Sequence, residues 1–218
     1  MATILLIHGG NVSSDTWNGI VGCNEFPSKM RLGGRVWDRV ALILRQHGYR
    51  VYAPTLLDEY ANDLSQHIIQ AVEYIEENHL SNICLVGHSY AGMVISGVAA
   101  KISSKIRQLV YLDAAFPLSG ESLFDLLNSA GIAPSSIIEG QPKAYTQVFD
   151  FDLQKLDAID KSYIFCTQSE FKSVAVLVRD RIKRNPSHWR CYNLDASHLP
   201  QAEKPTLLAN LLEKIIAS

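Results

Sequence analysis

The sequence lacks the features of proteins that bind nucleic acid or membranes. Its 218 residues include 20 Lys or Arg and 22 Asp or Glu, so the formal net charge is −2. No run of basic residues offers the positive field that nucleic acid or a membrane surface attracts. No apolar run reaches the roughly 18 residues of a transmembrane helix. We therefore expect no nucleic-acid or membrane partner, and a partner has to be inferred from a site and not from charge.

Cysteine is scarce as well. Cys23, Cys84, Cys166 and Cys191 form no C-x-x-C pair, and two of them lie inside apolar runs. Neither a disulfide framework nor a metal site is expected, and a reducing compartment fits this usage. The opening "MATILLIHGG" is too short to span a bilayer and lacks the basic start and the cleavage site of a signal peptide. The expected location is the cytoplasm.

Repeats, low-complexity tracts and linkers are absent too, so one domain over residues 1–218 is expected. Short apolar runs alternate with segments of helical apolar spacing, and such runs are typical of parallel strands buried on both faces. The alternation predicts an α/β fold with a mostly parallel, doubly wound sheet flanked by helices. The expected strands are 3–9, 49–55, 82–89, 106–114, 162–168 and 189–195, and the expected helices are 36–48, 64–79, 91–103 and 204–218.

Two segments interrupt this alternation. The first, Asn11 to Gly34, is rich in Gly, Ser and Asn and is long for a strand-to-helix loop, and loops of this length are often functional. The second, about 116–160, has helix-like pieces with an apolar stripe and no convincing strand. We expect it to be a cap-like insertion over the carboxyl edge of the sheet, where ligands bind in open α/β folds. The alternative that most leucines of the stripe are simply core stays open.

The stretch "NICLVGHSYAGM" places a serine where a strand turns abruptly into a helix. Gly87 stands two residues before Ser89, and Ala91, followed by Gly92, stands two residues after it. This small-x-Ser-x-small pattern is typical of a nucleophile on a strained turn, because the strand and helix backbones pass close together there. The common form has Gly where Ala91 stands, and a methyl group is a minor departure. Ser89 is therefore the predicted nucleophile.

At this point the chain resembles the α/β-hydrolase superfamily. The segments "LLIHGG", "LVGHSYAGMVISGVA" and "LVYLDAAFPLSGESL" make it similar to small esterases related to plant methylesterases, plant hydroxynitrile lyases and bacterial pyrethroid-hydrolase-like proteins. The resemblance covers most of the chain, but the Asn11–Gly34 loop and the middle of the insertion match poorly. It implies an α/β-hydrolase fold, carboxylesterase activity, a Ser-His-acid triad and no cofactor.

The resemblance also indicates the catalytic base and the oxyanion hole. His198, in a loop between the last strand and the last helix, lies where the family has its catalytic histidine. The backbone N–H groups of Tyr90, which follows the nucleophile, and of Gly10, in the loop after the first strand, are the expected oxyanion donors. His8 and His88 flank glycines in the two site loops, and we expect structural hydrogen bonds from them.

The acid departs from the family pattern. Relatives usually have an aspartate after the next-to-last strand, where this chain has Ser169, followed by Glu170. Asp113 ends the preceding strand, a position that some α/β-hydrolases, such as haloalkane dehalogenases, use for their acid. Asp113 is the preferred acid and Glu170 the alternative, although Asp113 could also be a structural loop residue. Asp195 lies too close to His198 in the chain to be a good third choice.

The favoured function is hydrolysis of a small, largely apolar carboxylic ester through an acyl-enzyme. A hydroxynitrile-lyase-like carbon–carbon lyase is a second possibility, but those relatives carry a lysine directly after the catalytic histidine, where this chain has Leu199. A catalytically retired member that only binds a ligand is a third possibility, because a fold does not fix a function. The sequence does not indicate the substrate's identity or an oligomeric state.

Overall fold

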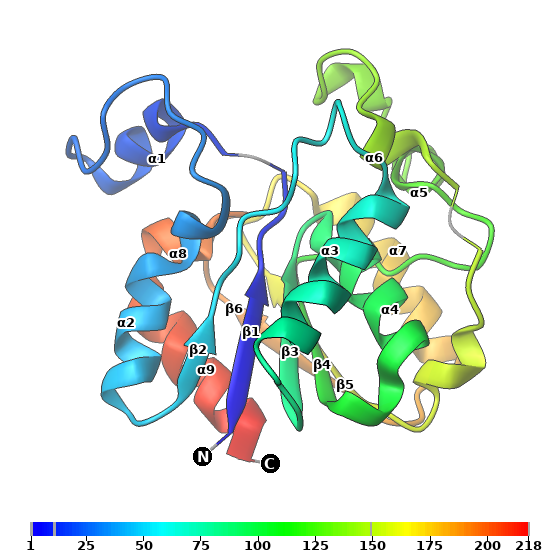
Figure 1. The fold of residues 1–218 in the computed structure, drawn as a ribbon. Helices are drawn as coiled ribbons and strands as arrows, with labels where there is room; N and C mark the ends of the chain where they lie inside the picture. The colour runs from blue at the N-terminus through cyan, green and yellow to red at the C-terminus, as the bar shows by residue number, and fades with distance from the viewer. Residues whose placement is uncertain (1, 11, 149, 218) are drawn as a thin grey trace.

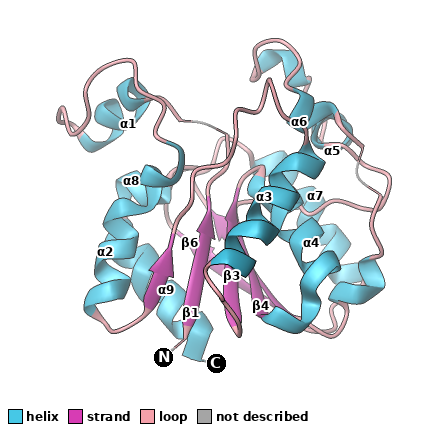
Figure 2. Ribbon diagram, in the orientation of Figure 1, coloured by secondary structure: helices cyan, strands magenta, loops and turns pink. Residues whose placement is uncertain are grey.

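We describe the protein from a computed structural model, in which residues 2–10, 12–148 and 150–217 are described. Six strands form one sheet in the order β2-β1-β3-β4-β5-β6, and every neighbouring pair is parallel (Figure 2). All six expected strands are present, which confirms the predicted parallel sheet. The strands are β1 (Thr3–Ile7), β2 (Arg50–Tyr52), β3 (Ile83–His88), β4 (Ile106–Leu112), β5 (Asp160–Cys166) and β6 (Trp189–Leu194).

Helices cover both faces of this sheet, α2 and α9 on one face and α3, α4 and α7 on the other (Figure 1). The helices are α1 (Ser14–Val21), α2 (Asp38–Gln46), α3 (Leu64–Glu77), α4 (Ala91–Ile102), α5 (Leu123–Ser129), α6 (Lys143–Thr146), α7 (Lys172–Arg184), α8 (Pro200–Glu203) and α9 (Pro205–Ala217). Short 3₁₀ helices are η1 (Gly33–Trp37), η2 (Ser103–Lys105), η3 (Pro134–Ser136) and η4 (Leu153–Leu156). Helix α7 is a clear amphipathic element that the sequence analysis did not single out.

The alternation of side chains along each strand divides the core into two layers. In β1, Ile4 and Leu6 pack with the α2 and α9 side, whereas Leu5 and Ile7 pack with the α3 and α4 side. All four side chains are fully buried. A strand buried on both faces needs no polar side, which explains the continuous apolar runs in the sequence. Of the helices in the described residues, none is long and apolar enough to cross a membrane.

The loop predicted between Asn11 and Gly34 contains a helix. Asn11 itself lies outside the described residues, but Ser13 caps α1 by accepting a hydrogen bond from the Thr16 backbone N–H at 3.1 Å. The two ends of the segment are joined where Ser13 and Arg31 form an antiparallel β-bridge. The two ends of the segment therefore lie side by side. Helix α1 lies beside the carboxyl ends of the strands (Figure 1).

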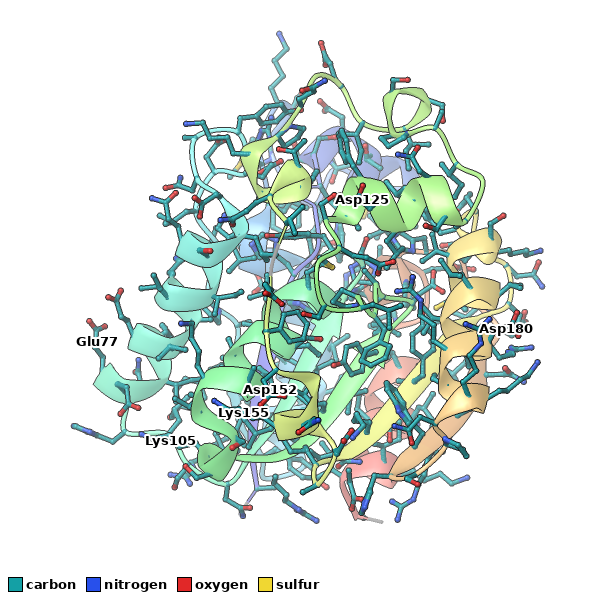
Figure 3. All side chains as sticks on the ribbon, turned by 90° about the vertical axis from the view of Figure 1, so that its right-hand side faces the viewer. Glu77, Lys105, Asp125, Asp152, Lys155 and Asp180 are labelled. Carbon is teal, nitrogen blue, oxygen red and sulfur yellow. The ribbon has the colours of Figure 1, made fainter. Side chains whose placement is uncertain are left out.

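The predicted insertion lies over the carboxyl edge only in part. Helices α5 and α6 stand above that edge, opposite α1, whereas η4 packs beside α4 near the amino ends of the strands (Figure 1). The chain has to return there because β5 runs parallel to β4. Helix α5 begins at a capping box in which Ser122 and Asp125 exchange hydrogen bonds, and Asp125 is labelled on this helix in Figure 3.

Close packing after β3 explains the glycine that follows the serine turn. A Cβ atom added to Gly92 would overlap deeply with the carbonyl oxygen of Ala115, which is backbone and has little room to move. A Cβ atom added to Gly87 would lie 2.7 Å from the carbonyl oxygen of Ala91. The start of α4 is thus pressed against both β3 and the segment after β4.

We expect Gly92→Ala to lower the free energy of unfolding by about 3 kcal/mol or more, because the methyl group forces backbone apart. Gly19→Ala is the matched control, since Gly19 lies in α1 with no atom within 4 Å of an added Cβ. That change should raise stability by up to about 1 kcal/mol through helix propensity. Urea unfolding of both variants checks this, and equal effects of the two changes would contradict the packing described above.

Candidate active site

Ser89 lies at the end of β3 in a left-handed backbone conformation, with φ of 56°. This region is costly for a residue with a side chain and persists only where surrounding bonds enforce it. Here the Ser89 carbonyl oxygen accepts hydrogen bonds from the N–H groups of Gly92 at 3.2 Å and Ala115 at 3.0 Å, and the Ser89 N–H donates to Leu112 at 3.2 Å. The turn is therefore held by the first turn of α4 and by the end of β4, and the hydroxyl faces the cavity described below.

His198 lies between Ser89 and Asp113. Its Nε2 atom is 2.9 Å from the Ser89 Oγ atom, and its Nδ1 atom is 2.7 Å from the Asp113 Oδ2 atom. Because a carboxylate only accepts hydrogen bonds, Nδ1 carries the proton and Nε2 is free to accept from the serine hydroxyl. The Asp113 carboxylate is 1% exposed, so this pair is shielded from water. The structure thus brings together three residues that are far apart in the sequence.

Asp113 is also in the left-handed region, with φ of 44°. Its backbone N–H continues the sheet by donating to Ile164 at 2.9 Å, and its Oδ1 atom accepts from the Cys166 N–H at 3.5 Å. The strand end therefore fixes the carboxylate from both its backbone and its side chain.

The alternative acids lie elsewhere. Glu170 is exposed, and no hydrogen bond joins it to His198 within the described residues. Ser169, at the position where relatives usually have the acid, is buried and accepts from the Phe171 N–H at 3.0 Å. The Phe171 ring then packs on the His198 ring with 4.3 Å between centroids. Asp195 bonds Thr167 and Gln168 on the surface. The turn at Ser169 therefore places the Phe171 ring beside the imidazole. The carboxylate partner of the imidazole is Asp113, which follows β4.

The expected oxyanion donors face the same cavity as Ser89. Gly10 and Tyr90 both line it, and neither backbone N–H has an acceptor within residues 2–10, 12–148 and 150–217. The neighbouring Gly9 must be a glycine, because an added Cβ atom would lie 2.7 Å from the Ser89 Cβ atom. The loop after β1 therefore approaches the serine turn closely enough to present backbone donors.

Buried histidines support both site loops. The Leu56 N–H donates to His8 Nε2 at 2.9 Å, so His8 carries its proton on Nδ1 and donates to the Gly9 carbonyl at 2.9 Å. His88 donates from Nε2 to the carbonyl oxygen of His198 at 2.7 Å. These contacts confirm the structural roles predicted for His8 and His88. Burial lowers the pKa of His8 from 6.5 to about 4, and burial and the nearby His198 lower the pKa of His88 well below 6.5.

The cavity over Ser89 has a volume of about 460 Å³. Its charged lining includes Arg31 and Glu59, whose guanidinium and carboxylate are 2.9 Å apart. Its apolar lining is formed by Leu123, Leu127, Ile137, Ile138, Phe171 and Val174.

Four further residues line the cavity without being marked by any sequence motif, because they come from segments that are distant in the sequence: Arg31, Glu59, Tyr145 and Phe171. In the described part of the chain, no group of three or more His, Cys, Asp or Glu side chains is placed to hold a metal ion.

Comparisons with known proteins show the family to which the chain belongs. The model of the alpha/beta hydrolase family matches residues 4–159. The chain is similar to a carbendazim hydrolyzing esterase of Nocardioides sp. (strain SG-4G), at 39% identity over 60% of this chain and 49% of that protein. It is also similar to a pyrethroid hydrolase of Sphingobium wenxiniae, at 31% identity over 52% of this chain and 39% of that protein. The chain thus spans half or less of the length of these relatives.

A solved structure shares the fold over the whole chain. A pyrethroid hydrolase from Sphingobium faniae JZ-2 has a TM-score of 0.72 at 19% identity, covering 100% of this chain and 98% of that one. This likeness confirms the α/β-hydrolase fold predicted from the sequence.

Acid should lower the free energy of unfolding, because His8 is buried in its neutral form. Its pKa is 6.5 unfolded and about 4 folded, so the unfolded chain takes up the proton first as the pH falls from 6.5 to 4. The stability is fully present above pH 6.5 and is lost across that window, by about 2 kcal/mol between pH 7 and pH 5. Urea unfolding at several pH values measures this loss. The variant His8→Asn should be less stable at neutral pH but show a shallower pH dependence, and an unchanged slope would contradict the assignment.

Proposed function

The chain belongs to the alpha/beta hydrolase family, and we propose that it is a serine hydrolase that cleaves small carboxylic esters through Ser89, His198 and Asp113. The observation that carries this proposal is the continuous hydrogen-bonded line from the Ser89 hydroxyl through His198 to the buried Asp113 carboxylate. A serine hydroxyl is a poor nucleophile at neutral pH unless a base removes its proton, and this line supplies one. The esterase and hydrolase names of the relatives support ester hydrolysis.

In the first half of the reaction, Ser89 Oγ attacks the ester carbonyl carbon while His198 Nε2 takes the hydroxyl proton. Asp113 holds the imidazole in the required tautomer and stabilises its charged form. The carbonyl oxygen becomes an oxyanion, which accepts from the N–H groups of Gly10 and Tyr90. His198 then gives the proton to the leaving alcohol oxygen, and the carbon–oxygen bond of the ester breaks to leave an acyl-Ser89.

In the second half, water replaces the alcohol. His198 Nε2 removes a proton from the water as its oxygen attacks the acyl carbon, and the oxyanion forms at the same two donors. Collapse of this intermediate returns the proton to Ser89 Oγ and releases the carboxylic acid. The chain's own residues supply every group that these steps use, and no cofactor enters them.

The residues that line the cavity favour a substrate with one apolar part. The apolar side chains from α5, the 137–138 segment and α7 can cover an alkyl or aryl group, while Arg31 and Glu59 offer polar groups to the rest of the substrate. Leu199, directly after His198, also lines the cavity. A lyase that handles cyanide needs a positive charge at that place, so the apolar Leu199 favours the esterase. The cytoplasm remains the expected location.

Hydrolysis of p-nitrophenyl acetate and butyrate by three variants tests the proposal. Ser89→Ala removes the nucleophile and should lower kcat by about 10³-fold or more. Asp113→Asn should have a comparable effect, because the imidazole loses the partner that fixes its tautomer. Glu170→Gln is the matched control for a carboxylate at the alternative position and should stay within about twofold of wild type.

Thermal unfolding of each variant separates loss of chemistry from loss of fold. Full activity in folded Asp113→Asn, together with a large loss in Glu170→Gln, would reverse the choice of acid. Ser89→Ala with wild-type activity would refute the serine mechanism. If the wild type hydrolyses neither ester, labelling of Ser89 by a fluorophosphonate distinguishes an unusual substrate preference from a site that only binds.

A further inference from the structure

The hydroxyl of Tyr145 differs from those of the other buried tyrosines. Tyr90, Tyr111, Tyr145 and Tyr163 are the buried tyrosines among the described residues. The Tyr90 hydroxyl is 3.0 Å from His67 Nδ1, that of Tyr111 is 2.9 Å from Ser96 Oγ, and that of Tyr163 donates to the Ala114 carbonyl at 2.7 Å.

The Tyr145 hydroxyl has no such partner within residues 2–10, 12–148 and 150–217, although Tyr145 is only 6% exposed. The Tyr145 oxygen is not among the buried unpaired polar atoms of the described residues, so the hydroxyl is open to a cavity although the rest of the side chain is covered, and a ligand in that cavity can be its partner.

This hydroxyl faces the cavity that contains Ser89. Tyr145 lines that cavity together with Gly10, Ser89 and Tyr90. Its Oη atom is 3.1 Å from the place where a Cβ atom on Gly10 would stand. The phenol therefore sits over the backbone of the residue whose N–H is a proposed oxyanion donor, on the side open to substrate.

Helix α6 is anchored where it presents this side chain. The Ala144 N–H donates to the Glu59 carbonyl at 3.1 Å, and the Gln147 side chain accepts from the Ser65 N–H at 2.8 Å. The α6 segment is thus tied on one side of Tyr145 to the loop between β2 and α3, and on the other side to the first turn of α3. A hydroxyl on such a support needs little reorganisation to meet a substrate oxygen.

A second set of contacts fixes the ring itself. The rings of Tyr145 and Tyr90 have centroids 4.7 Å apart. His67 donates from Nε2 to the Leu57 carbonyl at 3.1 Å, which leaves Nδ1 to accept from the Tyr90 hydroxyl. Burial lowers the pKa of His67, so this neutral form is the one present at neutral pH. The Tyr145 hydroxyl is the open end of this connected set.

The protonation state of the Tyr145 hydroxyl allows it to donate a hydrogen bond. Burial, and then the nearby Glu59 carboxylate, raise the pKa of Tyr145 above 10, so the O–H keeps its proton at neutral pH. A neutral phenol next to a forming negative charge donates a hydrogen bond that strengthens as the charge develops.

We propose that Tyr145 is a further catalytic residue, whose O–H donates a hydrogen bond to the ester carbonyl oxygen and to the oxyanion that forms from it. Together with the N–H groups of Gly10 and Tyr90 it makes a third donor for the same oxygen. The phenol keeps its proton throughout, and no bond to Tyr145 forms or breaks. The inference rests on the proposed function, because it assigns Tyr145 to the reaction of Ser89.

Tyr145→Phe tests this role, because it removes the hydroxyl and keeps the ring that packs on Tyr90. With p-nitrophenyl butyrate we expect kcat to fall about 10- to 100-fold while KM changes less than about threefold, since the bond strengthens in the transition state. Phosphonylation of Ser89 by a fluorophosphonate should slow by a similar factor, because its phosphoryl oxygen occupies the same place. The thermal midpoint should not fall, since the lost hydroxyl has no protein partner.

Tyr74→Phe is the matched control, since it removes a phenol hydroxyl on α3 that does not line the cavity. It should leave kcat and the phosphonylation rate within about twofold of wild type. Wild-type kcat in Tyr145→Phe, or a rise in KM alone, would overturn the catalytic role. A lower kcat accompanied by a thermal midpoint reduced by about 5 °C or more would indicate a structural role and would also overturn it.

Failure of the proposed function gives a different result. In that case the wild type would neither hydrolyse the ester nor become labelled at Ser89, and the catalytic role of Tyr145 would fall with it. An active wild type with an equally active Tyr145→Phe would reject the role of Tyr145 alone and leave the serine mechanism in place.

Discussion

The left-handed turn at Ser89 is the constraint on which the rest of the site depends. It lifts the hydroxyl out of the line of β3 and frees the Tyr90 N–H at the start of α4. Such a turn is stable only if neighbouring backbones come close enough to bond it, which they do through Gly92 and Ala115. The small residues around the serine are therefore a packing requirement of the turn and have no separate chemical role.

The loops of the site are also held by a set of buried, neutral imidazoles. In each of three histidines, a ring nitrogen forms a hydrogen bond with a backbone group of a loop outside the sheet. These histidines are His8, His67 and His88. Burial lowers the pKa of all three, so each can donate at one nitrogen and accept at the other near neutral pH. An imidazole suits this use because it joins two loops while remaining uncharged in the core.

The segments that close the cavity come from opposite sides of the sheet. The α1 segment contributes Arg31 and the α5–α6 segment contributes much of the apolar lining. The two segments are linked through the loop that carries Glu59 and Tyr60. Glu59 accepts from Arg31, and the Tyr60 hydroxyl donates to the Glu139 carbonyl at 2.9 Å. These contacts fix the shape of the entrance, which the sheet alone would leave open.

The sequence by itself determined the sheet, the serine turn and the family, because each depends on local pattern. Apolar runs specify buried parallel strands, and small residues around Ser89 specify the turn. The partner of His198 was decided only by the tertiary structure. Asp113 and Glu170 were both reasonable from spacing, and the parallel pairing of β4 with β5 places the first in the core while the turn at Ser169 leaves the second in solvent. Tyr145 lies beyond sequence reasoning for the same reason, since its neighbours Gly10 and Tyr90 are brought to it only by folding.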